Sequence, residues 1–172
     1  MKIFTFFFIF LINTNIYAIN IATVDLDLIL NKSFSYQTFI NIINEFIDIE
    51  TLKFKSNETI LQKNKADIES KQNILNESEF NKLISNYNDQ LNIYQNNINN
   101  FNLLIDENIE VNKKIIIKKI VEILKEISIQ DNYDLILTSN NFLLAHNKFD
   151  ISNQVIIKLD EYKILLNTNN IK

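Results

Sequence analysis

The residues of this chain that could take part in acid–base or nucleophilic chemistry are few. His146 is the only histidine. As a general base it would need a nucleophile such as Ser139 or Ser152, and Asp150 could orient it. The spacing of these residues matches no nucleophile motif. We therefore interpret His146 as a polar residue at the end of a strand and predict no catalytic residue.

Asp25 and Asp27 form the pair of carboxylates best placed to share a cation. They alternate with Val24, Leu26 and Leu28, so both would lie on one side of a strand that continued through them. Hard divalent cations need about six oxygen ligands, and no further ligands are nearby in the sequence. We therefore interpret the pair as solvated carboxylates at a strand end, and predict neither a metal nor a cofactor.

Missing residue types exclude several classes of function. The 172 residues contain no Gly, Pro, Cys or Trp. Without cysteine there can be no disulfide framework, thiolate zinc site or cysteine nucleophile. Without glycine there is no Walker loop and no dinucleotide-binding GxGxxG motif. The net charge of −4 lacks the basic surface of a nucleic-acid-binding domain. We therefore predict a protein that is not an enzyme and binds no nucleic acid.

Residues 1–18 have the layout of a secretory signal peptide. Lys2 precedes a nearly continuous apolar run over 3–12, and a short polar stretch then ends on Ala18. An uncleaved anchor is the alternative, but the apolar run is about half of the roughly 20 residues that span a bilayer. We predict cleavage after Ala18, export to the periplasm and no stable membrane insertion of the mature chain.

The central region, 37–130, has the spacing of two long helices. A strict seven-residue apolar repeat runs through its first half, at Ile40, Ile47, Phe54, Leu61, Ile68 and Leu75. Asn76 and Glu79 have the spacing of a capping box, which predicts that a second helix starts there. Two long helices with a short connection run antiparallel. About 40 residues per helix predict a hairpin on the order of 60 Å long.

The second helix carries two interleaved seven-residue repeats, as in a coiled-coil seam. The aliphatic repeat is Ile84, Leu91, Ile98 and Ile105, and the aromatic repeat is Phe80, Tyr87, Tyr94 and Phe101. The pattern slips by four residues after Ile105 and then resumes. The aromatic row either packs against the first helix or forms a binding surface, and its seam spacing favours packing. The candidate seam or partner-facing residues are Phe54, Leu61, Ile68, Leu75, Phe80, Tyr87, Leu91, Tyr94 and Phe101.

Short elements flank the two helices. Strand-forming residues are concentrated at the start of 20–30, where a strand followed by a short turn or helix would fit, and again over 133–138. The pair Asn140-Asn141 indicates a turn, and 142–145 reads as a further strand.

Asp150 and Ser152 are candidate N-caps for a last amphipathic helix from Asn153 to about Leu166. A polar tail, 167–172, follows this helix. The fold class predicted from the order of elements is α+β. The two parts of a small β body, 19–36 and 131–172, would be separated by the inserted antiparallel hairpin. So small a sheet leaves open edges, which predicts that the body is completed by oligomerisation.

This layout resembles the Skp/OmpH family of periplasmic chaperones. Asn-Ile-Ala-Thr-Val-Asp over 20–25 is similar to the opening strand of the family, and Tyr-Asp-Leu-Ile-Leu over 133–137 to a later one. Asp-Ile-Ser over 150–152, followed by Val155, is similar to its closing motif. The resemblance implies a homotrimer whose three helical arms enclose unfolded outer-membrane proteins without ATP. The acidic net charge and the glycine-free tip depart from the family pattern.

The resemblance therefore predicts an ATP-independent holdase that prevents aggregation of unfolded outer-membrane proteins. An exported coiled-coil protein that tethers envelope layers is the alternative, and it should show an unbroken two-position seam. A basic cluster near the end of the second helix could attract anionic lipid headgroups, although a solvated helix face is the simpler interpretation. This cluster consists of Lys113, Lys114, Lys118 and Lys119.

Overall fold

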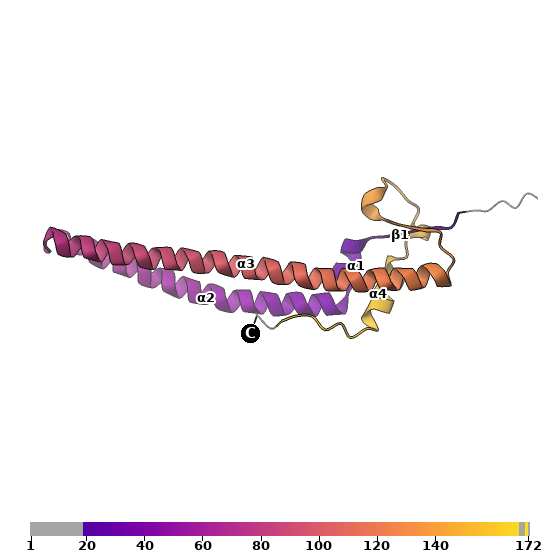
Figure 1. Cartoon of the computed structure of the whole chain (residues 1–172), viewed down its shortest axis with the longest axis horizontal. Coiled ribbons are helices and arrows are strands. Elements are labelled where there is room, and N and C mark those ends of the chain that lie inside the picture. The colour runs from indigo at the N-terminus through magenta and orange to yellow at the C-terminus, as the bar shows by residue number, and fades with distance from the viewer. Residues whose placement is uncertain (1–18, 169–170, 172) are drawn as a thin grey trace, which may run out of the picture.

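The computed structural model describes residues 19–168 and Ile171, and shows a long helical hairpin that projects from a small body (Figure 1). The predicted signal peptide, 1–18, lies outside the described residues. The elements in chain order are β1 (Ile21–Val24), α1 (Leu26–Lys32), α2 (Phe34–Ser70), α3 (Glu77–Gln130), β2 (Leu135–Thr138), the 3₁₀ turns η1 (Ser139–Asn141) and η2 (Asn147–Phe149), and α4 (Ser152–Asp160). The predicted α+β class with an inserted antiparallel hairpin is confirmed.

The two helices of the hairpin differ in length. Helix α2 has 37 residues and α3 has 54, so α3 continues past the start of α2 and through the body. The side chain of Asn76 accepts a hydrogen bond from the backbone N–H of Glu79 at 3.0 Å. This N-cap confirms the predicted start of the second helix, because it satisfies one of the free N–H groups of the first turn.

The sheet consists of β1 and β2, which are parallel and pair Ile21 with Leu135 and Val24 with Thr138. Parallel strands need a long crossover connection, and the whole hairpin serves as that connection here. Strand β1 ends at Val24 because Asp25 caps α1, its carboxylate accepting from the N–H of Leu28 at 2.9 Å.

The prediction of a further strand over 142–145 is wrong. Leu143 and Leu144 are fully exposed, and no strand neighbours them within the part of the chain that the structure describes. The sheet is extended at β1 by a single parallel bridge between Thr23 and Asp150. An apolar run becomes a strand only where a partner strand accepts its hydrogen bonds.

The last helix also ends earlier than predicted. Helix α4 stops at Asp160, and not near Leu166, and the Asp160 carboxylate accepts from the N–H of Phe34 at 2.9 Å. The chain then runs back from the body along the base of the hairpin, in the direction of the hairpin tip (Figure 1). This segment includes part of the predicted polar tail, and its Ile171 is buried.

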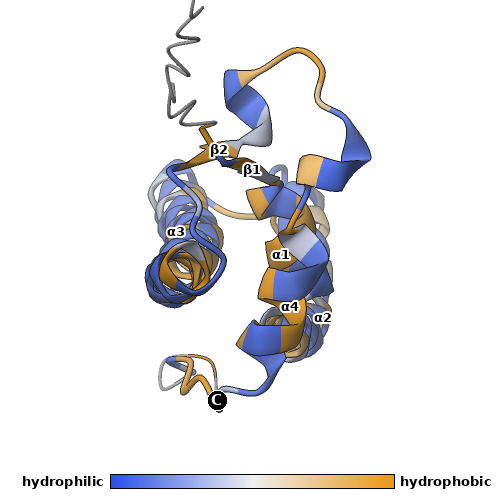
Figure 2. Cartoon of the chain, turned by 90° about the vertical axis from the view of Figure 1, so that its right-hand side faces the viewer, coloured by the Kyte–Doolittle hydropathy of each residue, from blue (hydrophilic) through white to orange (hydrophobic). Residues whose placement is uncertain are grey.

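The main core lies where the last turns of α3 meet the rest of the body. Viewed from the body end, α3 lies on one side, α1 and α4 on the other, and the sheet on top (Figure 2). The fully buried residues of this core are Ala22, Ile29, Ile116, Ile120, Ile123, Ile127, Val155 and Leu159. A second cluster at the base of the hairpin contains Phe39, Ile43, Ile105 and Ile171.

Candidate functional site

The seam between α2 and α3 contains a row of aromatic rings. The centroid of the Phe54 ring lies 5.4 Å from that of Phe101 and 6.3 Å from that of Tyr94. The ring of Phe46 lies 5.7 Å from Phe101 on the side nearer the body. For Tyr94 and Phe101, the structure therefore supports the interpretation that the aromatic row packs against the first helix.

The other predicted residues follow the same seam toward the tip. Leu61 and Ile68 are 8% and 9% exposed. The remaining members of the predicted set are half-buried, namely Phe54, Leu75, Phe80, Tyr87, Leu91, Tyr94 and Phe101. The seam is thus the narrow interior of the hairpin, and its residues reach the surface only in part.

A second apolar stripe runs beside the seam and is exposed. On α2 it comprises Ile42, Ile49 and Ile60, and Ile49 and Ile60 are 54% and 53% exposed. Their spacings of seven and eleven residues correspond to about two and three helical turns, which places them on one side of α2. We call these residues, together with Ile93 and Val111 of α3, the apolar flank.

Ile60 of α2 and Ile93 of α3 line the same hollow between the two helices, so the flank residues of the two helices approach each other there. Ile93 is 59% exposed and Val111 is 39% exposed, and they lie eighteen residues, or about five turns, apart on α3. The seven-residue repeats did not indicate this stripe, because they mark the residues that the two helices bury in each other. A second apolar repeat of seven and eleven residues, offset from the seam, was the signal that could have shown it.

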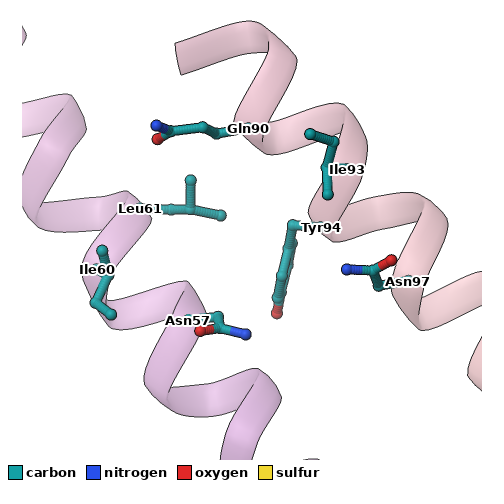
Figure 3. Close-up of a pocket in the computed structure, with 7 residues that line it drawn as sticks. All are labelled: Asn57, Ile60, Leu61, Gln90, Ile93, Tyr94 and Asn97. Atoms are coloured by element: carbon teal, nitrogen blue, oxygen red, sulfur yellow. The ribbon is translucent and has the colours of Figure 1, made fainter. Parts of the chain in front are cut away.

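A shallow hollow of about 210 Å³ lies where the flank and the seam meet, between α2 and α3 (Figure 3). Leu61 and Tyr94 point into the space between the helices, and Ile60 and Ile93 lie at its rim. The side chain of Gln90 reaches toward α2 and accepts from Nδ2 of Asn64 at 3.4 Å.

The lining of this hollow indicates what it can bind. Its side chains are aliphatic groups, one phenol and the amides of Asn57, Gln90 and Asn97, and no carboxylate, histidine or lysine is among them. Apolar groups bury apolar side chains of a partner, while amides can donate to and accept from its backbone. Such a surface is suited to binding polypeptide, and it carries no group of an acid–base pair.

The structure gathers Ser139, His146 and Asp150 around one cavity of about 200 Å³ in the body. Asp150 and His146 nevertheless make hydrogen bonds that serve local structure. Asp150 accepts from the N–H of Ser152 at 2.8 Å and from its hydroxyl at 2.5 Å, and Nδ1 of His146 accepts from the N–H of Lys148 at 3.2 Å. In a catalytic triad, the aspartate accepts a hydrogen bond from the N–H at Nδ1 of the histidine, whereas Nδ1 of His146 is itself an acceptor. His146 is therefore better interpreted as a structural polar residue, although the predicted strand that it was expected to end does not form and His146 instead caps η2.

The carboxylates of Asp25 and Asp27 do not share a strand face. Asp25 is the N-cap of α1 and Asp27 lies in its first turn, where acidic side chains stabilise the helix dipole. Over 19–168 and Ile171, the structure contains no group of three or more His, Cys, Asp or Glu that could hold a metal ion. The same residues include no helix that is both long and apolar enough to span a membrane.

The basic cluster on α3 lies beside the body. Nζ of Lys119 is 3.7 Å from the ring centroid of Tyr162 and 3.2 Å from Oε2 of Glu122. Stacking of an ammonium on an aromatic face stabilises the contact by about 0.5–2 kcal/mol. Lys119 therefore helps to hold the segment that follows α4.

The fold is a two-helix arm that projects from a small α+β body and carries exposed apolar residues on both of its helices. The family model described as Outer membrane protein (OmpH-like) matches residues 20–159, and the chain therefore belongs to the OmpH-like family. Residues 160–172, which include the segment after α4, lie beyond this match.

A solved structure shares this fold. It is the crystal structure of a protein from Caulobacter crescentus CB15 that is provisionally assigned as an OmpH-like outer membrane chaperone. The match covers 87% of this chain and 89% of the other, with a TM-score of 0.69 and 12% sequence identity. A comparison with curated protein sequences finds no significant match.

Proposed function

We propose that the protein is an ATP-independent periplasmic holdase that binds unfolded outer-membrane proteins and prevents their aggregation. The observation that carries this proposal is the apolar flank, an exposed stripe along an arm that few other elements cover. Membership of the OmpH-like family supports a role as a chaperone. Binding of this kind needs no catalytic group.

The spacing of the flank suits weak binding at many points. Each aliphatic side chain that becomes buried contributes about 1–2 kcal/mol at most, because half of its surface is already covered by the hairpin. Several such contacts on one flexible client act together through their high effective concentration. A client can therefore be held firmly as a whole while each segment exchanges rapidly.

We also propose that the protein is a homotrimer. Two observations on the described part of the body support assembly: its sheet has two strands, and Leu143 and Leu144 are almost fully exposed. Open sheet edges and exposed leucines favour association with further chains. Sedimentation equilibrium tests this proposal, and a folded, stable monomer at micromolar concentration would contradict it.

The tether alternative has less support. A tether should have a continuous apolar seam, whereas the distal seam here includes the hydrogen-bonded amides of Asn64 and Gln90. Polar pairs at such positions lower the stability of a coiled coil. The holdase is therefore the function that the arm favours.

A light-scattering assay tests the holdase. A urea-unfolded outer-membrane barrel protein is diluted into buffer with and without the mature chain, and suppression of scattering is the expected result. Replacing Ile60 and Ile93 with Asn should raise the concentration of chain that half-suppresses scattering by about thirtyfold, because two apolar contacts of about 1 kcal/mol each are lost. Ile129→Asn is the matched control, since Ile129 is 79% exposed but lies at the body end of α3. Equal loss in the control would contradict the role of the flank.

A further inference from the structure

The segment after α4 lies in a groove at the base of the hairpin. It passes across the gap between α2 and α3, on the side opposite the sheet (Figure 2). Ile171 is 4% exposed and packs in the cluster of Phe39, Ile43 and Ile105. A stretch of chain without secondary structure thus buries an apolar side chain between α2 and α3.

Asn112 binds the backbone of this segment. Its Oδ1 accepts from the backbone N–H of Asn167 at 2.6 Å, and its Nδ2 donates to the carbonyl of the same residue at 2.9 Å. Asn112 is fully buried between Ile105 and Ile116 of α3, one turn after Asn108, which is also buried. Any residue except proline offers the same N–H and C=O pair, so this contact selects an extended chain without selecting its sequence.

The segment fills its groove incompletely. A cavity of about 520 Å³ remains between the α2 side, with Thr38 and Ile42, and the segment side, with Tyr162, Leu166 and Thr168. This cavity is open to solvent, as the exposed Phe34 and Ile42 at its wall show, so that side of the segment contacts water and the segment buries less apolar surface than a core element. Ile42 also belongs to the apolar flank, which makes the groove continuous with the exposed stripe of the arm.

We propose that this groove is a binding site for an extended, apolar polypeptide segment, and that residues 164–168 with Ile171 are its intramolecular occupant. A segment of an unfolded client displaces this occupant and gains the same contacts, namely the backbone pair with Asn112 and the apolar cluster. The inference rests on the proposed function for the class of ligand. It adds a site, a mode of recognition and a competitor within the chain.

A synthetic peptide with the sequence of residues 163–172 and a fluorescent label is the probe, and its anisotropy is titrated with the mature full chain. In the wild type, the tethered segment competes at an effective concentration in the millimolar range. Ile171→Asp should release it and tighten peptide binding by about tenfold. Leu165→Asp places the same charge on a side chain that is 91% exposed, and should bind the peptide like the wild type.

A second substitution tests the backbone pair. In the Ile171→Asp background, Asn112→Ala should remove the gain, whereas Asn100→Ala, an exposed position on the same helix, should keep it. Equal peptide binding by Ile171→Asp and the wild type would overturn the inference. So would loss of helical structure both in Ile171→Asp and in a chain that ends after Leu166, because the segment would then be a permanent part of the base.

The light-scattering assay on the same variants separates this inference from the proposed function. Tighter peptide binding without any suppression of aggregation would support the groove as a peptide-binding site and contradict the proposed holdase function. Suppression of aggregation without peptide binding in any variant would uphold the holdase and overturn the groove.

Discussion

The two ends of α3 have the same apolar periodicity but differ in how completely they are covered. In the body, Ile116, Ile120, Ile123 and Ile127 are fully buried, because α1, α4 and the sheet surround that end of the helix. In the distal arm, Leu91 and Tyr94 are half-buried, because α2 is their main neighbour. A heptad pattern thus shows which side of a helix faces inward, while the number of neighbouring elements decides how much of that side is covered.

This difference implies two levels of stability in one helix. The body has a contiguous core and should unfold as a unit, whereas the distal arm has a thin seam and can open locally. For a protein that binds unfolded chains, a weakly covered arm keeps apolar surface available. The body meanwhile keeps the arms in place.

The largest expected effect is in the body. Ile120→Ala removes a fully buried side chain from the main core, and should lower the free energy of unfolding by about 2–5 kcal/mol. Urea unfolding followed by circular dichroism measures this change. The matched control is Ile129→Ala on the same helix, where 79% exposure predicts a change within about 0.5 kcal/mol. Similar values for both variants would show that burial in the main core does not determine how much a side chain at this end of α3 stabilises the body.

The long helices were predictable because their signals are local and repeated. The seven-residue repeats indicated the hairpin, and Asn76 with Glu79 indicated its turn. The strands that form β1 and β2 were also indicated by their residue types, although the parallel register needed the structure. The fold class followed from the order of these elements.

The features that were predicted wrongly or missed from the sequence depend on residues that are distant in the chain. The apolar run over 142–145 has strand-forming residues but no partner strand in the structure, and α4 ends early where Asp160 binds the start of α2. The buried amide of Asn112 could not be distinguished from the many other asparagines, because its partner is fifty-five residues away. The apolar flank was missed because only the assembled hairpin shows which apolar residues stay uncovered.

A smaller effect is expected in the distal seam. Leu91→Asp places a charge between α2 and α3, and should destabilise the distal arm by about 1–3 kcal/mol, since the carboxylate is partly desolvated there. Hydrogen exchange should become faster from about residue 60 to residue 98, while the body stays protected. The neighbouring exposed position supplies the control, Asn92→Asp. Loss of protection in the body would mean that arm and body unfold together.

A substitution at the tip of the hairpin should change stability still less. Asn76→Ala removes the side chain that caps α3, which should destabilise the first turn by about 1 kcal/mol. We expect faster hydrogen exchange in that turn and no shift in the urea midpoint of the body. Asn73→Ala, an exposed residue in the connection between α2 and α3, is the control. A shift in the global midpoint would show that the tip contributes to the cooperative unit.

The smallest expected effect is that of salt on client capture. The distal arm carries exposed ion pairs such as Lys71–Asp67 at 2.7 Å, and pairs of this kind contribute little. The described arm has slightly more carboxylates than lysines, so it exerts no strong attraction at long range. Raising ionic strength from low to physiological shortens the Debye length to about 8 Å, and should change the capture rate by less than about twofold. Stopped-flow mixing with an unfolded barrel protein measures this rate. A steep fall with salt would place the first contact at the lysine cluster beside the body, where Lys113 and Lys118 lie, and would remove the distal arm from the capture step.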